Sequence, residues 1–221
     1  MMTNLFSTFD PSTSIKFSLN WISMMLFFLF PVTFWMKKSR FKMMMSVIIN
    51  FLLNELKITL NFKSKEIILI LMSTFMLILI NNMMGLLPYI FTATSHMLTN
   101  LSIALPLWLS IMLFSWTNKT KIMLIHLTPL GTPEPIMPFM VMIEMISNLI
   151  RPISLSVRLT ANMITGHLLM TLLETSMQLK NLPIISIQMF LMSFEVAVAF
   201  IQAYVFSMLM TLYISEVNYV K

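Results

Sequence analysis

The stretch from Met137 to Thr175 constrains the fold of this chain more than any other. It reads MPFMVMIEMISNLIRPISLSVRLTANMITGHLLMTLLET, a long apolar run of the kind that forms membrane helices. An arginine at the centre of a membrane helix costs about 3 kcal/mol on insertion scales and roughly 10 kcal/mol or more in simulations. The ionisable residues of this run therefore need partners or a function. They are Glu144, Arg151, Arg158 and His167.

Read as one helix, the run carries a polar stripe. At about 100° per residue, five polar residues fall within about 80° of arc, whereas His167 points to roughly the opposite side. A helix of this length spans about 55 Å, but the apolar core of a bilayer is only about 30 Å thick. The helix must therefore tilt strongly or bend, and Pro152 is the predicted kink. The stripe consists of Glu144, Asn148, Arg151, Arg158 and Asn162.

The overall composition is that of an integral membrane protein. Of the 221 residues, 58% are hydrophobic and only 10% are charged, whereas soluble domains carry about 25% charged residues. This leaves too little polar sequence for a separate soluble domain, so residues 1–221 are predicted to form one membrane domain. The net charge of +6 does not indicate nucleic-acid binding, because the basic residues lie between apolar segments.

No cofactor or metal site is predicted from the sequence. Cysteine is absent, so disulfides and thiolate metal sites are excluded. Three glycines are too few for a glycine-rich nucleotide loop, and the residues around His96 and His126 lack metal-ligand spacing. We therefore expect the chain itself to bind no nucleotide and to perform no covalent chemistry.

The chain is predicted to be all-α, with five membrane crossings and one helix that lies in the membrane interface. The interfacial helix covers residues 43–62, where polar residues recur every three or four positions on one face. A small helix packed on a partner protein is the alternative for this segment. The other segments are an outer tail at 1–16, an upright first span at 17–36, two spans at 67–87 and 98–116, and a long, strongly tilted hairpin formed by 137–175 and 184–215.

Basic residues define the predicted orientation. The cluster Lys37, Lys38, Arg40 and Lys42 directly follows the first span and should stay on the inner side of the membrane. The N-terminus then lies on the outer side and the C-terminus on the inner side. Most of the other lysines also fall on the inner side in this arrangement, which makes it self-consistent.

A second set of polar residues lies in the last helix. Glu195 and Gln202 are seven residues apart, so they share a helix face about 10 Å apart along the axis. Because a short loop joins the two long helices, we expect them to pack antiparallel, with Glu195 close to His167. A carboxylate and an imidazole at membrane depth suit a proton relay, since imidazole titrates near neutrality.

Arg158 has a different predicted role. A guanidinium keeps its proton under physiological conditions, so Arg158 cannot take part in a relay. A permanent charge in a proton path acts instead as an electrostatic barrier and as a counter-ion for a carboxylate. No acidic residue lies within one turn of Arg158 on its own helix face, so we expect the counter-ion to come from another protein.

Five segments together resemble the mitochondrial F-type ATP synthase subunit a family. They are NNMMGLLPY, HLTPLGTPEPIMP, IEMISNLIRPISL, SVRLTANMITGHLL and EVAVAFIQAYVF, and the resemblance covers most of the chain from about Ile67 onward. The first 60 residues match only in pattern. The family implies a stator in the mitochondrial inner membrane, beside a rotating ring of small c subunits. Further partners implied are peripheral-stalk subunits, other membrane subunits and lipid, but no nucleic acid.

The resemblance also implies roles for the candidate residues. Arg158 matches the arginine that separates two offset, water-filled half-channels, which carry protons to and from a carboxylate of the ring. Bacterial relatives commonly have an acid where His167 stands and a histidine where Glu195 stands, so this chain has the mitochondrial arrangement. The positions of the outer half-channel are matched by Asn162, His167, Glu195 and Gln202.

The inner half-channel is less well defined by the resemblance. Glu144 is expected to belong to the exit on the matrix side. Asn148 and Arg151 are further candidates because they share the polar stripe, and a structural role is equally open for Arg151. Three acids near segment ends are expected to be ordinary interfacial charges, namely Glu134, Glu174 and Glu216.

Two other classes of function compete with a proton-conducting stator. A transporter or a respiratory-chain membrane subunit would need internal repeats or paired charged spans, and the sequence has no clear repeat. A passive anchor or assembly subunit would tolerate neutral substitutions at Arg158 and His167. Substrate flux through the isolated chain would identify the first alternative.

Overall fold

The computed structural model describes residues 5–13, 17–29, 39–60, 65–87, 90–118, 120–128, 133–176 and 182–219. Every regular element within these ranges is a helix, as the sequence predicts. Four 3-10 helices are short connecting pieces: η1 (Leu5–Phe9), η2 (Leu19–Leu29), η3 (Ala93–Ser95) and η4 (Glu134–Ile136). The α-helices are α1 (Arg40–Leu60), α2 (Lys65–Gly85), α3 (Met97–Asn118), α4 (Thr120–His126), α5 (Met137–Ser176) and α6 (Leu182–Tyr219).

Five helices in the described ranges are long and apolar enough to cross a membrane. The predicted spans 67–87 and 98–116 correspond to α2 and α3, and the two arms of the predicted hairpin correspond to α5 and α6. Their observed ends differ from the predicted ones by only a few residues because long apolar runs define them. The short helix α4 was not predicted.

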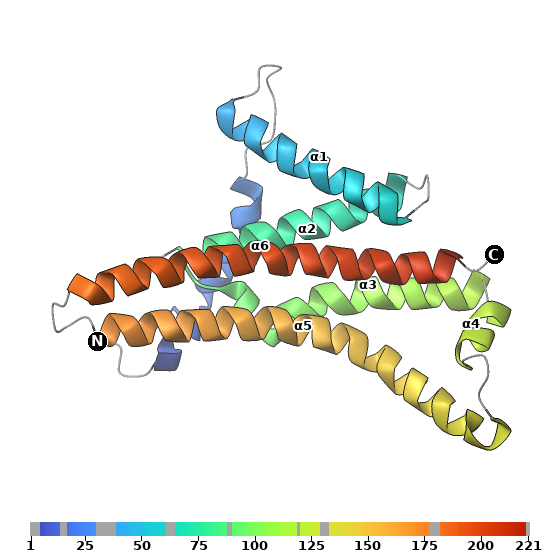
Figure 1. Ribbon diagram of the computed structural model, residues 1–221. Helices are drawn as coiled ribbons and strands as arrows, with labels where there is room; N and C mark the ends of the chain where they lie inside the picture. The colour runs from blue at the N-terminus through green and yellow to red at the C-terminus, as the bar shows by residue number, and fades with distance from the viewer. Residues whose placement is uncertain are drawn as a thin grey trace.

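Two N-terminal predictions remain open. Of the predicted first span at 17–36, residues 19–29 form the 3-10 helix η2, and residues 30–36 lie outside the described residues. The predicted interfacial helix at 43–62 corresponds to α1, which is also apolar enough to span. In Figure 1, α1 runs obliquely to the other helices, whereas α2, α3 and α6 lie roughly along one direction, and α6 contacts both α2 and α3.

The apolar core is centred on α2 and α6, and α1, α3 and α5 also contribute buried residues to it. Along α6, buried residues recur every three or four positions, so one face of this helix packs inward. Of the apolar stretch of α2, 44% is buried within the chain, compared with 6% for α5. α5 therefore leaves most of its surface to lipid or to another protein. The core includes Leu71, Phe75 and Ile78 of α2 and Ala199, Ala203, Phe206 and Met210 of α6.

The helices α5 and α6 form an antiparallel hairpin, drawn in yellow to red in Figure 1. We call the end where α5 finishes and α6 starts the hairpin end, and the end where α5 starts and α6 finishes the open end. α5 is one helix of 40 residues that contains Pro152, and it bends visibly in its yellow-to-orange part. A proline inside a helix removes a backbone hydrogen bond, so it is the expected cause of the bend.

Candidate functional site

The predicted polar stripe lies along the boundary between the buried and the exposed face of α5. The buried face contains Leu155, Leu159 and Met163, which follow one another at intervals of one turn. Arg158 lies about 100° away from Leu159 around the helix and is exposed. No ion pair to Arg158 occurs within the described part of the chain.

Arg151, two turns before Arg158, is in contact with two carboxylates. Its Nη2 lies 3.6 Å from Glu144 Oε1 on the same helix, and its Nη1 lies 3.4 Å from Glu216 Oε2 on α6. The guanidinium also lies 5.1 Å from the centre of the Tyr213 ring, within cation–π range. Arg151 therefore joins α5 to α6 at the open end.

Glu195 is buried against α5, with only 7% of its surface exposed. It continues the inward face of α6, four residues before Ala199. Its carboxyl group lies directly on Gly166: a Cβ atom added there would be 2.5 Å from Glu195 Cδ and 2.8 Å from Oε1. Only glycine leaves room for this approach, which brings Glu195 beside the residue that precedes His167.

His167 on α5 contacts two other segments of the chain. Its imidazole interacts with the backbone of Gly85 at the end of α2, and the ring of Phe9 in η1 meets it edge-on at 6.3 Å. Its Nε2 atom is buried without a hydrogen-bond partner in the described residues. In these ranges no hydrogen bond joins His167 to Glu195 directly, although their surroundings are contiguous at Gly166.

The remaining predicted residues are partly exposed. Asn148 and Asn162 lie on the stripe of α5, and Gln202 lies on α6 two turns after Glu195. None of their side chains forms a hydrogen bond to another predicted site residue within the described ranges. The structure therefore pairs Glu144 with Arg151 and places Glu195 against Gly166, the residue before His167, whereas Arg158 forms no ion pair among the described residues.

Three residues that contribute to this arrangement were missed from the sequence. Gly166 could have been noticed, because an isolated glycine inside a helix often has a packing reason. Tyr213 carried no signal of its own. Glu216 was expected to be an ordinary interfacial charge, and its pairing with Arg151 across the hairpin was not predicted.

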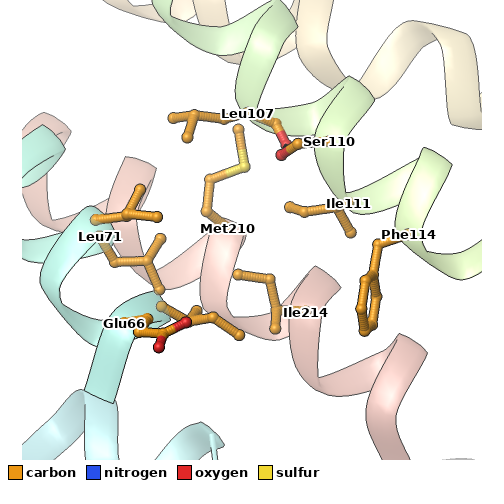
Figure 2. Close-up of a pocket in the computed structure, with 10 residues that line it drawn as sticks. Glu66, Leu71, Leu107, Ser110, Ile111, Phe114, Met210 and Ile214 are labelled. Atoms are coloured by element: carbon orange, nitrogen blue, oxygen red, sulfur yellow. The ribbon is translucent and has the colours of Figure 1, made fainter. Parts of the chain in front are cut away.

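Among the described residues, the candidate site coincides neither with a group of metal-binding side chains nor with the cavity shown in Figure 2. No group of three or more histidine or acidic residues with metal-binding geometry occurs in the described ranges. Figure 2 shows a cavity of about 310 Å³ between α2, α3 and α6, lined mainly by apolar side chains such as Leu71, Ile111 and Met210. None of the predicted site residues lines it, so it is not the candidate site.

Comparison with known proteins identifies the family of this chain. The family model "ATP synthase A chain" matches residues 17–215. ATP synthase subunit a of Locusta migratoria is 55% identical over 232 residues, covering 98% of this chain and 100% of the relative. The corresponding proteins of Anopheles gambiae and Drosophila melanogaster are 53% and 51% identical, each covering 99% of this chain and all of the relative. Since the match extends over nearly the whole sequence, this chain belongs to the ATP synthase A chain family.

Proposed function

We propose that this chain, a proton-translocating stator subunit of an F-type ATP synthase, carries protons along two separate paths that meet only at a carboxylate of a neighbouring rotor. The observation that carries the proposal is the contrast between two arginines. Arg151 has two carboxylates of its own chain beside it, whereas Arg158 is exposed without an acidic partner in the described residues. A guanidinium at membrane depth needs such a partner, so the missing carboxylate belongs to another protein.

The surface around Arg158 suits apolar helices that move past it. On the adjoining face of α5, Ile150, Ile153 and Val157 are between 42% and 52% exposed, although they are hydrophobic. A ring of apolar c-subunit helices, each with one carboxylate, would cover these side chains and offer its acids to Arg158 in turn. Few polar groups would have to be stripped of water at each step, which keeps the sliding contact smooth.

Arg158 also explains why protons would drive rotation. A fixed positive charge repels a proton that approaches from either path, so a direct leak through the stator is blocked. A proton can then cross only on a ring carboxylate that turns with the rotor. Each proton that moves down the membrane potential supplies about 2.3 kcal/mol per 100 mV, which the rotor transmits to the nucleotide-binding subunits.

The path at the hairpin end uses the buried pair of titratable groups. Glu195 lies against Gly166, the residue that precedes His167, and the two groups can bind and release protons through intervening water. Asn162 and Gln202 are partly exposed on the flanks of the two helices and can hold water between this pair and the rotor.

The path at the open end is lined by the other polar residues of the stripe. Glu144 is partly exposed, with 40% of its side chain accessible, so it can exchange protons with water on that side. Arg151 holds Glu144 and Glu216 in place and keeps their charges balanced. Asn148, one turn after Glu144, can hold water beside it.

The placement in the membrane follows from the charge pattern of the sequence. The chain is a multi-pass membrane protein, and we assign it to the mitochondrial inner membrane, with the N-terminus on the intermembrane side and the C-terminus in the matrix. The hairpin end then faces the intermembrane side. The oblique α1 lies in the membrane interface, where it can contact lipid and peripheral-stalk subunits.

Replacing Arg158 tests the proposal. In the complete ATP synthase reconstituted into vesicles, Arg158→Gln is expected to abolish ATP synthesis driven by a proton gradient, because the barrier and the counter-ion are both lost. ATP hydrolysis by the soluble subunits should persist once it is uncoupled from the membrane part. The matched variant Arg40→Gln, which removes an exposed arginine of α1 outside both paths, should retain coupled synthesis. Normal coupled synthesis with Arg158→Gln would refute the proposal.

A further inference from the structure

A group of buried polar residues lies beyond the predicted site, where α2 ends and α3 begins. None of its members is charged, and each is at most 9% exposed. Polar side chains in an apolar chain are costly to bury unless they are hydrogen-bonded, so such a concentration needs an explanation. The group comprises Asn81, Asn82, Thr92, Thr94, Ser95, Thr99 and Asn100.

Part of this group is satisfied by the local backbone. Thr99 Oγ1 donates to the carbonyl oxygens of Ala93 and His96, at 2.8 and 2.7 Å. Ser95 Oγ donates to the carbonyl of Thr92 at 2.7 Å, and Asn100 Nδ2 donates to that of Thr94 at 2.8 Å. These bonds fix the turn from α2 to α3, and they leave other polar atoms of the region unused.

Four polar atoms around this turn are buried without a partner in the described residues, and His167 Nε2 is the fifth such atom there. A buried polar atom that lacks a hydrogen bond costs about 1 to 3 kcal/mol, and ordered water commonly supplies the missing bond. The segments that carry these atoms contact one another, since η3 touches η2, α2 and α5. The four atoms are Ser23 Oγ, Asn82 Oδ1, Thr94 Oγ1 and His96 Nε2.

The contacts of Gly85 join this region to His167. A Cβ atom added at Gly85 would lie 3.0 Å from Thr92 Cγ2 and 3.3 Å from Met163 Cε, so the turn, α2 and α5 meet there. Met163 precedes His167 by one helical turn, and the imidazole of His167 interacts with the backbone of the same Gly85. The unpaired atoms therefore belong to a neighbourhood that leads to His167.

At the other side of this neighbourhood, His96 is held in an aromatic cluster. Its ring centre lies 5.3 Å from that of Trp21 in η2 and 5.4 Å from that of Phe91, and these two rings lie 5.7 Å apart. Trp21, Phe91 and His96 are each partly exposed, whereas Thr94 is buried, so this aromatic cluster reaches the surface of the subunit.

From this geometry we infer that the proton path to His167 opens between η2 and η3, with His96 at its mouth. The inference rests on the proposed function. Water enters past Trp21 and Phe91, bonds to the Nε2 of His96 and continues along the unpaired hydroxyl of Thr94 and amide of Asn82. It supplies protons to His167 from the side opposite Glu195. His96 and Thr94 thus become residues of the outer path, although no motif identified them.

Cysteine substitution can test this path, because the chain has no cysteine of its own. Thr94→Cys and Ser23→Cys would be introduced singly into the complete ATP synthase in vesicles and treated with Ag⁺ from either side of the membrane. The matched control is Ser115→Cys, since Ser115 is fully buried in α3 but its hydroxyl donates to the carbonyl of Met112 at 2.6 Å.

We expect Ag⁺ added from the intermembrane side to inhibit proton-driven ATP synthesis in the Thr94→Cys and Ser23→Cys complexes, but not in the Ser115→Cys complex. Replacing Trp21 by leucine in the Thr94→Cys complex should speed its reaction with Ag⁺ by about tenfold, equivalent to about 1.4 kcal/mol of easier opening. His96→Phe, which keeps an aromatic ring but removes Nε2, should slow proton uptake from that side more than His96→Gln does.

Two results would overturn the inference. One is inertness of the cysteines at positions 94 and 23 in a complex that otherwise synthesises ATP normally. The other is reaction only with Ag⁺ added from the matrix side. Both results would leave the proposed function intact, because that function depends on Arg158 and not on this path. Coupled synthesis in the Arg158→Gln complex would instead refute the function itself, whatever the cysteines do.

Discussion

The two halves of the α5–α6 hairpin differ in whether their charged residues have partners within the chain. At the open end, Arg151 lies within 4 Å of carboxylates from both helices and faces the Tyr213 ring. Two turns further along α5, Arg158 lies at nearly the same angle around the helix but has no acidic partner in the described residues. Beyond it, Glu195 is buried against Gly166 and likewise lacks an ionic partner there.

This contrast shows which charges are neutralised by partners within the subunit. The pairing of Arg151 shows that this hairpin can bring a carboxylate from α6 to an arginine on α5. The absence of such a pair at Arg158 in the described part of the chain is therefore a property of that position and not of the fold. Paired charges serve to join helices, whereas a charge without a partner remains available to a second protein or to a proton.

The largest difference in proton-driven ATP synthesis is expected between variants of the two carboxylates of α6. Glu195→Gln should lower proton-driven ATP synthesis by about 100-fold, the lower end of what a positioned proton-transfer group contributes. Glu216→Gln changes the same group to the same amide but at a paired position, so it should have little effect. ATP synthesis in reconstituted complexes measures both. Equal losses would show that pairing does not distinguish the two halves.

Placing a carboxylate beside Arg158 within the chain should remove the difference between Arg158 and the paired Arg151. Ala161 is exposed, one turn beyond Arg158 on the same helix, so Ala161→Glu would place a carboxylate within reach of the guanidinium. The pair would compete with the rotor carboxylate, and we expect proton-driven rotation to slow by about tenfold, equivalent to about 1.4 kcal/mol.

The control for this change is Ala161→Gln, which has the same size but no charge. It reports any steric disturbance of the contact with the rotor. If the glutamine variant slowed rotation as much as the glutamate variant, the effect would be steric, and the need for an unpaired Arg158 would not be supported.

A smaller effect is expected from closing the space that Gly166 leaves. Gly166→Ala puts a methyl group 2.5 Å from the present position of Glu195 Cδ, so the carboxyl group or the helices must move, at a cost of about 1 to 3 kcal/mol. Proton uptake should fall several-fold. The double variant with Glu195→Asp should recover part of it, because the shorter side chain withdraws the carboxyl group. Absence of recovery would show that helix packing, not the carboxyl group, was disturbed.

Local features of this chain could be predicted from the sequence, whereas contacts between distant residues could not. Helix ends and the stripe on α5 could be predicted, because apolar runs and the 3.6-residue period are local properties. The pairing of Arg151 with Glu216 could not, since 65 residues separate them and their contact depends on the register of the hairpin. That register depends on close packing such as that at Gly166. The turn around His96 was missed because its polar atoms meet only after α2, α3 and α5 have packed.

The smallest effect should come from removing the pair at the open end. The side chains of Arg151 and Glu216 are 32% and 64% exposed, so their ion pair should contribute no more than about 1 kcal/mol. A double-mutant cycle with Arg151→Gln and Glu216→Gln, measured as thermal stability of the complex, should give a coupling energy in that range. It should shrink as salt is added, because exposed charges are screened. A much larger coupling energy, or a loss of proton-driven synthesis in the Arg151 variant as severe as that of Arg158→Gln, would mean that the paired half also drives the motor. In that case, paired charges could no longer be assigned to joining helices and unpaired charges to proton transfer.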